Sequence, residues 1–331
     1  MIELDGSVGE GGGQILRTSL ALSCITGQPL RLVRIRAKRS RPGLRAQHLA
    51  CVRAAAQITG ARVSGDRVGS SELSFRPKKV RSGAFGFQVG TAGSTALVLQ
   101  TVLLPLALCG KGTSTLRIGG GTHAGMAPPV DFLQRVWLPL LERMGLRVEL
   151  RMEQPGFYPK GGGSIVARIH PGRLGRLELP KRGRPVALRA RVVCSGMGQE
   201  AIDEARTALE AQLTLDDFEV RRFDGARGLA VLVEAEHRCL TELFCGLADR
   251  GQRVAEAATE AAVQALAWSA QPEPVGQFLA DQLLLPMALG EGGAFRSVRP
   301  SLHSTTNAEV LRRFLPVEVT MEGGELRVTC D

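Results

Sequence analysis

The sequence predicts an α+β fold made from three copies of one unit, interrupted by a small inserted α/β unit. Glycine-rich turns that lead into apolar helices recur at intervals of roughly eighty residues, which is the sequence sign of a repeat. Residues 98–108 align with residues 279–289, both ending in Leu-Pro followed by an apolar residue, Ala and Leu. Between the second and third copies, residues 179–272 follow a different order of elements. Each copy has the order strand, helix, strand, loop, helix, strands, and its sheet needs the helices as cover.

The first copy begins with a strand at residues 2–5 and the glycine-rich turn 6–14. This turn lacks the spacing and the lysine of a phosphate-binding loop, and it is not a dinucleotide fingerprint. The remaining elements are expected in this order: helix 15–24, strand 30–35, basic loop 36–43, helix 44–59, and strands near 62–64 and 72–75.

The second copy follows the same order. Its expected elements are strand 84–89, turn 90–95, helix 96–109, strand 114–118, loop 119–129, helix 130–144 and strand 146–150. The third copy has helix 279–289, a strand at Phe295, the His303 loop and helix 307–314, which Thr305 or Thr306 would cap. If the copies surround a pseudo-threefold axis, loops 36–43, 119–129 and the His303 loop converge on one cleft, and Arg17, Gln100 and Asp281 occupy matching helix positions.

The domain prediction follows from the interruption. A large domain takes residues 1–178 and 273–331, and a small α/β domain takes residues 179–272. The expected elements of the small domain are strands 186–194, 218–222 and 229–233 and helices 199–213 and 251–268. The basic segment 181–184 and the Pro-containing segment 271–274 are the expected hinges.

Composition restricts the partners. Forty-two Lys and Arg against thirty-two Asp and Glu give a net charge of +10, which favours a polyanionic partner. One Tyr and two Trp argue against a broad stacking surface for single-stranded nucleic acid. No run approaches about 18 apolar residues and the start does not resemble a signal peptide, so no membrane contact is expected. Seven cysteines without repeated spacing favour free thiols in the cytoplasm, and we interpret His237, Cys239 and Cys245 as structural.

His303 is the candidate nucleophile, because a neutral imidazole near a helix N-terminus can attack phosphorus at neutral pH. The alternative is a histidine that only caps its loop. The run from Arg34 to Arg45 contains no acid, and its arginines suit phosphate oxygens, although a solvated basic face is the common explanation of such a run. Glu10 and Asp281 border glycine-rich turns and are candidates for binding Mg²⁺ or Mn²⁺ beside phosphates, with structural capping as the alternative for each.

Other residues receive weaker interpretations. His123 is a lesser catalytic candidate, because no acid and no apolar helix face is evident beside it in the sequence. His48 and His170 are interpreted as packing or surface residues. Phe278 and Pro128 would fit on the two faces of a flat base, with core packing as the alternative.

Several long motifs occur in one order along nearly the whole chain. They are Asp5–Arg17, Arg41–Leu44, Gln47–Leu49, Gly119–Thr122, Ala127–Phe132, Gly156–Gly163, Phe278–Gln282 and His303–Asn307. Together they resemble the RNA 3′-terminal phosphate cyclase family. The inserted domain is the part least similar to the family.

The resemblance implies three modules like the C-terminal domain of translation initiation factor 3, plus one small insert. It implies that the residue matching His303 attacks ATP, releases pyrophosphate and carries AMP as a covalent histidine–AMP. The AMP would pass to an RNA 3′-phosphate to give RNA-ppA, and the neighbouring 2′-hydroxyl would close a 2′,3′-cyclic phosphate and release AMP. The implied partners are RNA with a 3′-phosphate, ATP and a divalent metal, Mg²⁺ or Mn²⁺; a homodimer is possible.

The resemblance also implies residue roles. Arg36, Arg39 and Gln47 would hold the RNA terminal phosphate, with Arg17 nearby. The expected ATP contacts are Glu10, Gln100, Pro128, Phe278, Asp281 and Gln282, with Glu10 and Asp281 also attending the metal. Many family members carry Tyr where this chain has Phe278, so stacking is kept and a hydroxyl hydrogen bond is lost.

Two other functions compete with this one. A relative without the nucleophile acts as an RNA-binding protein in ribosome biogenesis, and the presence of His303 with Asn307 argues against it. Enolpyruvyl transferases use similar modules in two multi-module domains, and three copies are too few for that arrangement.

Overall fold

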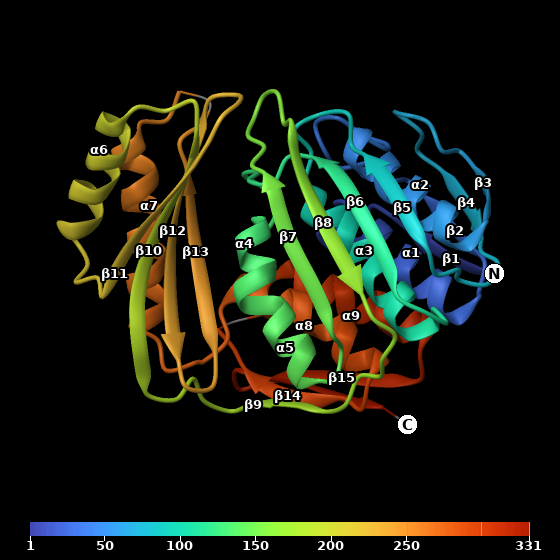
Figure 1. The fold of residues 1–331 in the computed structure, drawn as a ribbon. Coiled ribbons are helices and arrows are strands. Elements are labelled where there is room, and N and C mark those ends of the chain that lie inside the picture. Colours follow the sequence, from blue (N-terminus) through green and yellow to red (C-terminus); the bar gives the residue numbers. More distant parts are fainter. Residues whose placement is uncertain (250, 299, 331) are drawn as a thin grey trace.

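The computed structural model describes residues 1–249, 251–298 and 300–330, and Figure 1 shows their arrangement. The strands of these residues form four sheets of four strands each. Helices pack between and beside the sheets, so the predicted mixed class of helices and small sheets is confirmed. Among the described residues, no helix is both long enough and apolar enough to span a membrane.

The first unit has the strand order β1-β2-β4-β3. Strand β1 is parallel to β2, and the other two pairings are antiparallel. Its strands are β1 (Ile2–Asp5), β2 (Leu30–Val33), β3 (Arg62–Ser64) and β4 (Leu73–Arg76), and its helices are α1 (Gln14–Thr26) and α2 (Ala46–Thr59).

The second unit has the order β5-β6-β8-β7, again with one parallel pair, β5 and β6. Its strands are β5 (Ala84–Gln88), β6 (Ser114–Gly120), β7 (Val148–Gln154) and β8 (Gly163–Ile169). Helix α3 (Thr95–Cys109) is buried along nearly all of its length, as its uniformly apolar sequence requires. The second helical segment consists of α4 (Val130–Phe132), a π-helical turn η1 (Leu133–Trp137) and α5 (Leu138–Arg143).

The third unit has the order β9-β14-β16-β15, with β9 and β14 parallel and the other pairs antiparallel. Its strands are β9 (Leu177–Leu179), β14 (Gly293–Arg296), β15 (Val317–Glu322) and β16 (Glu325–Cys330), and its helices are α8 (Gln277–Leu289) and α9 (Leu302–Phe314). When the strands of each unit are numbered by their order in the chain, all three sheets have the same order across the sheet: first, second, fourth, third.

The helices of the three units pack on one another. Helix α1 contacts α2, α3 and α9, and α8 contacts α9 and η1. One hydrophobic core cluster includes residues from all three units. This shared helical layer brings the starts of α1 and α9, which are far apart in the sequence, to the same place.

The inserted unit lies in the chain between β9 and α8. It has the order β11-β10-β12-β13, and a second core cluster lies between its sheet and its two helices. Its elements are β10 (Pro185–Ser195), α6 (Gln199–Glu210), β11 (Asp217–Phe223), β12 (Gly228–His237), β13 (Thr241–Leu247) and α7 (Val254–Ser269). Helices α6 and α7 cover the outer face of the sheet, and the other face is turned toward the α4–α5 segment (Figure 1).

Several elements differ from the sequence prediction, among them β13 and α9. Strand β13 was not predicted, because its sequence carries Glu242 and Gly246 among the apolar residues. Helix α9 begins at Leu302 and not at residue 307, since Ser301 is the cap and its hydroxyl accepts a hydrogen bond from the Ser304 amide at 3.1 Å. The prediction of Thr305 or Thr306 as the cap is therefore wrong.

Candidate functional site

His303 lies inside the first turn of α9, one residue after the start of the helix. Its side chain is 46% exposed, so the ring reaches solvent while it packs against the protein. The Nδ1 atom is 2.5 Å from Oε1 of Gln14, the first residue of α1, and 3.9 Å from Oε2 of Glu10. The glycine-rich turn near the N-terminus and the His303 segment near the C-terminus thus form one site.

The surroundings of His303 keep it neutral. Burial lowers the pKa of its imidazole, the carboxylate of Asp281 acts in the opposite direction, and the nearby positive charges of Arg17 and Arg39 lower the pKa further. Because Oε1 of Gln14 is an acceptor, Nδ1 carries the proton of the neutral ring. The lone pair is then on Nε2.

Asp281 connects α8 to the first turn of α9. Its Oδ1 accepts hydrogen bonds from the hydroxyls of Ser301 at 2.8 Å and Ser304 at 2.5 Å. Its carbonyl accepts from Nδ2 of Asn307 at 3.1 Å. Burial raises the pKa of the Asp281 carboxyl, and these hydroxyl donors and His303 oppose that rise. The arrangement fixes the turn that carries His303.

Glu10 lies on the other side of His303. Its carboxylate forms an ion pair with Arg39, and its amide donates to Oγ1 of Thr306 in α9 at 3.0 Å. Within the described residues, the buried Oε2 of Glu10 has no hydrogen-bond partner. Glu10 therefore joins the basic loop to the His303 turn, which are two of the three loops expected to converge.

The carboxylates offer limited metal ligation. No group of three or more His, Cys, Asp or Glu that could hold a metal is present in residues 1–249, 251–298 and 300–330. The unpartnered Oε2 of Glu10 and the Asp281 carboxyl nevertheless suit Mg²⁺ or Mn²⁺, which use one or two carboxylates together with substrate phosphates. The donor set fits a metal that arrives with a nucleotide.

The predicted phosphate-binding residues have different surroundings. The Arg36 guanidinium donates to the carbonyls of Arg41 at 2.6 Å and Gly43 at 3.1 Å, and so it holds the basic loop in shape. Oε1 of Gln47 accepts from the amide of Ser94, the cap of α3, at 2.7 Å. Arg17 is partly buried, and within the described part of the chain its guanidinium has no hydrogen-bond acceptor and no carboxylate partner.

His48, which the sequence analysis interprets as a packing or surface residue, lies beside the candidate site. It is 8% exposed, and its Nδ1 accepts from the Arg45 amide at 3.1 Å, so its Nε2 carries the proton. Burial, and then the charges of Arg17, Arg36 and Arg45, lower the pKa of His48 to about 3. The ring is therefore a neutral donor among arginines. Its position directly after Gln47 was the only sequence signal for this role.

The space beside Gly13 is where His48 and Arg17 meet. A Cβ on Gly13 would lie 2.4 Å from Nε2 of His48 and 2.7 Å from Nη1 of Arg17. Gly13 is also the cap residue of α1, and no side chain caps this helix. Two donors and a helix N-terminus therefore face a position that only glycine leaves open.

Phe278, Gln282 and Gln100 form a second group. Phe278 is 67% exposed in the first turn of α8. Nε2 of Gln282 donates to the Phe278 carbonyl at 3.0 Å, and Nε2 of Gln100 donates to Oε1 of Gln282 at 2.5 Å. Pro128 is half-buried just before α4, and Trp137 of η1 donates to the Gln282 carbonyl at 3.1 Å. Helix α8, which carries Phe278, is therefore in contact with η1 of the helical segment that follows Pro128.

His123 differs from its sequence interpretation. The structure places an acid beside it: Nε2 is 3.1 Å from Oδ2 of Asp131, and Nδ1 is 2.9 Å from Oγ1 of Thr122. The ring is 1% exposed and stacks on Phe157 with 5.2 Å between ring centroids. The statement that no acid frames His123 is wrong, because Asp131 lies eight residues further on, in α4.

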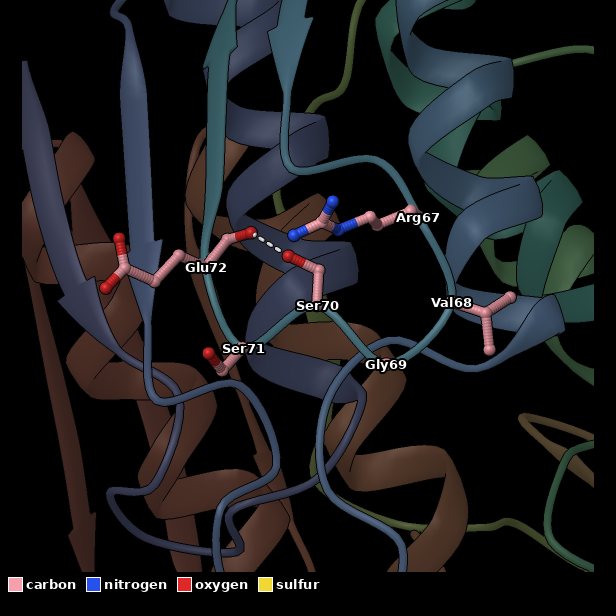
Figure 2. A pocket seen from close by; sticks show the side chains of 6 residues that line it. All are labelled: Arg67, Val68, Gly69, Ser70, Ser71 and Glu72. Atoms are coloured by element: carbon pink, nitrogen blue, oxygen red, sulfur yellow. Dashed lines mark hydrogen bonds between the residues drawn. The ribbon is translucent and has the colours of Figure 1, made fainter.

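A surface hollow, shown in Figure 2, lies elsewhere. It is lined by residues 67–72 of the loop between β3 and β4, where the Ser70 hydroxyl donates to the Glu72 carbonyl at 2.7 Å. This loop packs on the outside of the basic loop, since the Leu44 amide donates to the Ser70 carbonyl at 3.0 Å. None of the predicted site residues lines the hollow.

Comparison with known proteins assigns the chain to a family. A family model described as RNA 3′-terminal phosphate cyclase matches residues 8–321. The chain belongs to the RNA 3′-terminal phosphate cyclase family. Residues 10–14 and 303–307, which build the His303 site, lie inside the matched range.

Curated relatives named RNA 3′-terminal phosphate cyclase agree with this assignment and confirm the prediction of an enzyme. The protein from Ralstonia nicotianae is 45% identical over 97% of this chain and 93% of its own length. The protein from Pseudomonas fluorescens is 44% identical over 96% and 94%. The protein from Koribacter versatilis is 43% identical over 99% and 94%. A solved EPSP synthase from Acinetobacter baumannii, 10% identical, aligns over 54% of this chain and 49% of its own with a TM-score of 0.25, which is too low to indicate a common fold.

Proposed function

We propose that the protein converts an RNA 3′-terminal phosphate to a 2′,3′-cyclic phosphodiester at the expense of ATP, with His303 as the nucleophile. The observation that carries the proposal is the contact between Nδ1 of His303 and Oε1 of Gln14. The Nδ1–H of His303 is held by Gln14, which leaves the lone pair of Nε2 available on a half-exposed ring. Family membership supports the same reaction.

In the first step, Nε2 of His303 attacks the α-phosphorus of ATP. A P–N bond forms, the bond to the bridging oxygen breaks, and pyrophosphate leaves with the electron pair. The Nδ1–H to Gln14 contact stabilises the positive charge that develops on the ring, and Arg17 and Arg39 stabilise the charge on the phosphates. A divalent metal held by Glu10 and Asp281 would supply further positive charge for the departing pyrophosphate.

In the second step, an oxygen of the RNA 3′-phosphate attacks the same phosphorus and breaks the P–N bond, which gives RNA-ppA and free histidine. In the third step, the neighbouring 2′-oxygen attacks the RNA phosphorus, loses its proton and expels AMP. Each step transfers one phosphoryl centre, so catalysis depends on holding the groups in line and neutralising their charge.

We propose that the RNA terminal phosphate binds beside Gly13. An unpaired, partly buried guanidinium is costly, and an anion would offset the cost of burying Arg17. Nε2–H of His48 and the N-terminus of α1 add neutral donors to the same position. Arg39 would exchange part of its contact with Glu10 for phosphate, and Arg36 and Gln47 would act mainly by holding the loops that surround the pocket.

The nucleotide base is proposed to bind between Phe278 and Pro128. A Phe ring that is 67% exposed at a helix start is available for stacking, and Gln282 and Gln100 lie beside it. Asp281, whose Oδ1 is occupied by two serine hydroxyls, acts mainly by positioning α9.

The architecture supports these roles. We infer that the three sheets with one shared strand order are three modules around a pseudo-threefold axis, in a domain of residues 1–178 and 273–331. The inserted unit, with its own core cluster, would be a separate domain of residues 179–272.

The test is adenylylation of the protein. The chain is incubated with α-labelled ATP and Mg²⁺ or Mn²⁺, denatured, and examined for acid-labile, base-stable label. Label is expected on the wild type and not on His303→Ala. Label that persists on His303→Ala would remove this nucleophile, and an unlabelled wild type that still binds RNA would favour the RNA-binding alternative.

A further inference from the structure

The inserted unit reaches the start of α8 through a buried glutamate. Glu242 of β13 is 2% exposed, and its Oε1 accepts a hydrogen bond from the Gly276 amide at 2.7 Å. Gly276 is the cap residue of α8, and no side chain of its own segment caps the helix. The carboxyl group of another unit therefore satisfies a donor that a helix start leaves unpaired.

The close approach depends on glycine. A Cβ on Gly276 would lie 2.9 Å from Oε1 of Glu242, which is too close for any other residue without displacement of the carboxyl. The backbone of Gly276 has φ −72° and ψ 162°, which alanine adopts without strain. A Gly276→Ala change would therefore disturb this contact and leave the backbone unstrained.

The inserted unit also reaches the start of α4. Asp131 is 1% exposed, and its Oδ1 lies 3.7 Å from Nη1 of Arg191 in β10 and 3.9 Å from Nη1 of Arg221 in β11. A second contact joins η1 to the same sheet, where Nε of Arg135 is 3.3 Å from Oε2 of Glu234. Figure 1 shows that the sheet face opposite α6 and α7 is turned toward α4.

Both contacts lie next to a proposed wall of the base site. Phe278 is two residues after Gly276, and Pro128 is three residues before Asp131. An exposed side chain in the first turn of a helix takes its position from the backbone of that turn. Fixing Gly276 therefore fixes the direction of the Cα–Cβ bond of Phe278, and fixing Asp131 holds the end of the loop that contains Pro128.

We propose that the inserted unit positions both walls of the nucleotide base site, with Glu242 acting on Phe278 through Gly276 and with Arg191 and Arg221 acting on Pro128 through Asp131. The proposal rests on the proposed function and gives the inserted unit a role in ATP binding. None of these residues touches the reacting atoms, so they are positioning residues.

The test separates nucleotide binding from RNA binding. KM for ATP and KM for RNA with a 3′-phosphate are measured for wild type, Glu242→Ala, Glu242→Gln and Arg191→Met. We expect Glu242→Ala to raise KM for ATP about tenfold and to leave KM for RNA within about twofold. Glu242→Gln keeps an acceptor oxygen and should stay near the wild type. Arg191→Met should raise KM for ATP about threefold.

Glu204→Ala is the matched control. Oε1 of Glu204 in α6 accepts from the Ala255 amide in the first turn of α7 at 3.0 Å, so it makes the same kind of contact at a helix that carries no site residue. This variant should lower Tm and leave KM for ATP unchanged. A double-mutant cycle adds Gly276→Ala, which should raise KM for ATP in the wild type and add little to Glu242→Ala.

Several outcomes would overturn the proposal. One is an unchanged KM for ATP in Glu242→Ala together with a lower Tm. Another is an equal rise of both KM values. If Glu242→Ala does not fold, the values of KM for ATP in Arg191→Met and Gly276→Ala test the proposal, and unchanged values in both would overturn it. The adenylylation assay on the wild type is done first, so a failure of the proposed function is recognised separately.

Discussion

Two histidines of this chain, His303 and His123, differ in the two properties that decide whether an imidazole can act as a nucleophile. His303 is half-exposed and uses one nitrogen for a contact with Gln14. His123 is buried, stacks on Phe157 and uses both nitrogens, one with Thr122 and one with Asp131. The acid partner, which often suggests catalysis, belongs to the buried ring. Solvent access and a free lone pair, and not a neighbouring carboxylate, are therefore the grounds on which His303 is proposed as the nucleophile.

The largest effect is expected from His303→Ala. Loss of the nitrogen that carries AMP should reduce adenylylation by at least roughly a thousandfold, because no other group can replace a covalent nucleophile. Label transfer from α-labelled ATP measures it. His123→Ala is the comparison variant, and its folded fraction should still be labelled. The reverse pattern would mean that the two histidines have been assigned the wrong roles.

His123→Ala should mainly change stability. It leaves the buried Asp131 with only the more distant Arg191 and Arg221, and a buried polar group without its partner costs about 1–3 kcal/mol, with more for a charge and for the cavity. We expect the free energy of unfolding in urea to fall by about 3 kcal/mol. His303→Ala should change it by less than about 1 kcal/mol, and an equal loss in both variants would contradict the contrast.

His48 is the third histidine to compare with these two. His48→Ala removes the Nε2–H donor from the proposed phosphate pocket, and a hydrogen bond to a charged group is worth about 1.5–3 kcal/mol. KM for RNA ending in a 3′-phosphate should rise about tenfold or more, while the rate of adenylylation by ATP stays within about threefold. His48→Gln, which keeps a donor, should recover part of the loss. An unchanged KM for RNA would mean that His48 contributes only to packing.

The smallest effect is the pH dependence of adenylylation. Protonated His303 has no lone pair, so the rate falls as the pH drops through its pKa. Since burial, Arg17 and Arg39 lower this pKa, the fall should be centred below pH 6.5, the value of an unperturbed histidine. Arg39→Met removes one positive charge and should move the centre upward, by less than about one pH unit. His123→Ala should leave the centre where it is.

Much of the fold was predictable because helix periods and glycine-rich turns are local signals. Helices α1, α3 and α8 lie within two residues of their predicted bounds, where apolar faces and turns agree. The start of α9 was misplaced because the cap, Ser301, is also held by Asp281 of α8, and the sequence does not show that contact between two elements. Strand β13 was missed because Glu242 is buried by a partner that the sequence does not reveal.

Family motifs supplied the candidate site residues, and the structure brings His303, Glu10 and Arg39 together. A sequence motif does not show which side-chain atoms already have hydrogen-bond partners in the folded protein. Gln47 and Arg36 were expected on phosphate, and the structure uses Gln47 to hold the α3 cap and Arg36 to hold the basic loop. His48 lies within the motif Gln47–Leu49, but its proposed role as a hydrogen-bond donor depends on its contacts with Arg45 and Gly13, which only the folded structure shows.

The Gln14–His303 contact joins residues 289 positions apart. A ribosome releases the glycine-rich turn and every arginine of the basic loop long before it adds the histidine. The proposed adenylylation therefore requires that α9, which is among the last elements to be synthesised, is packed against the start of α1.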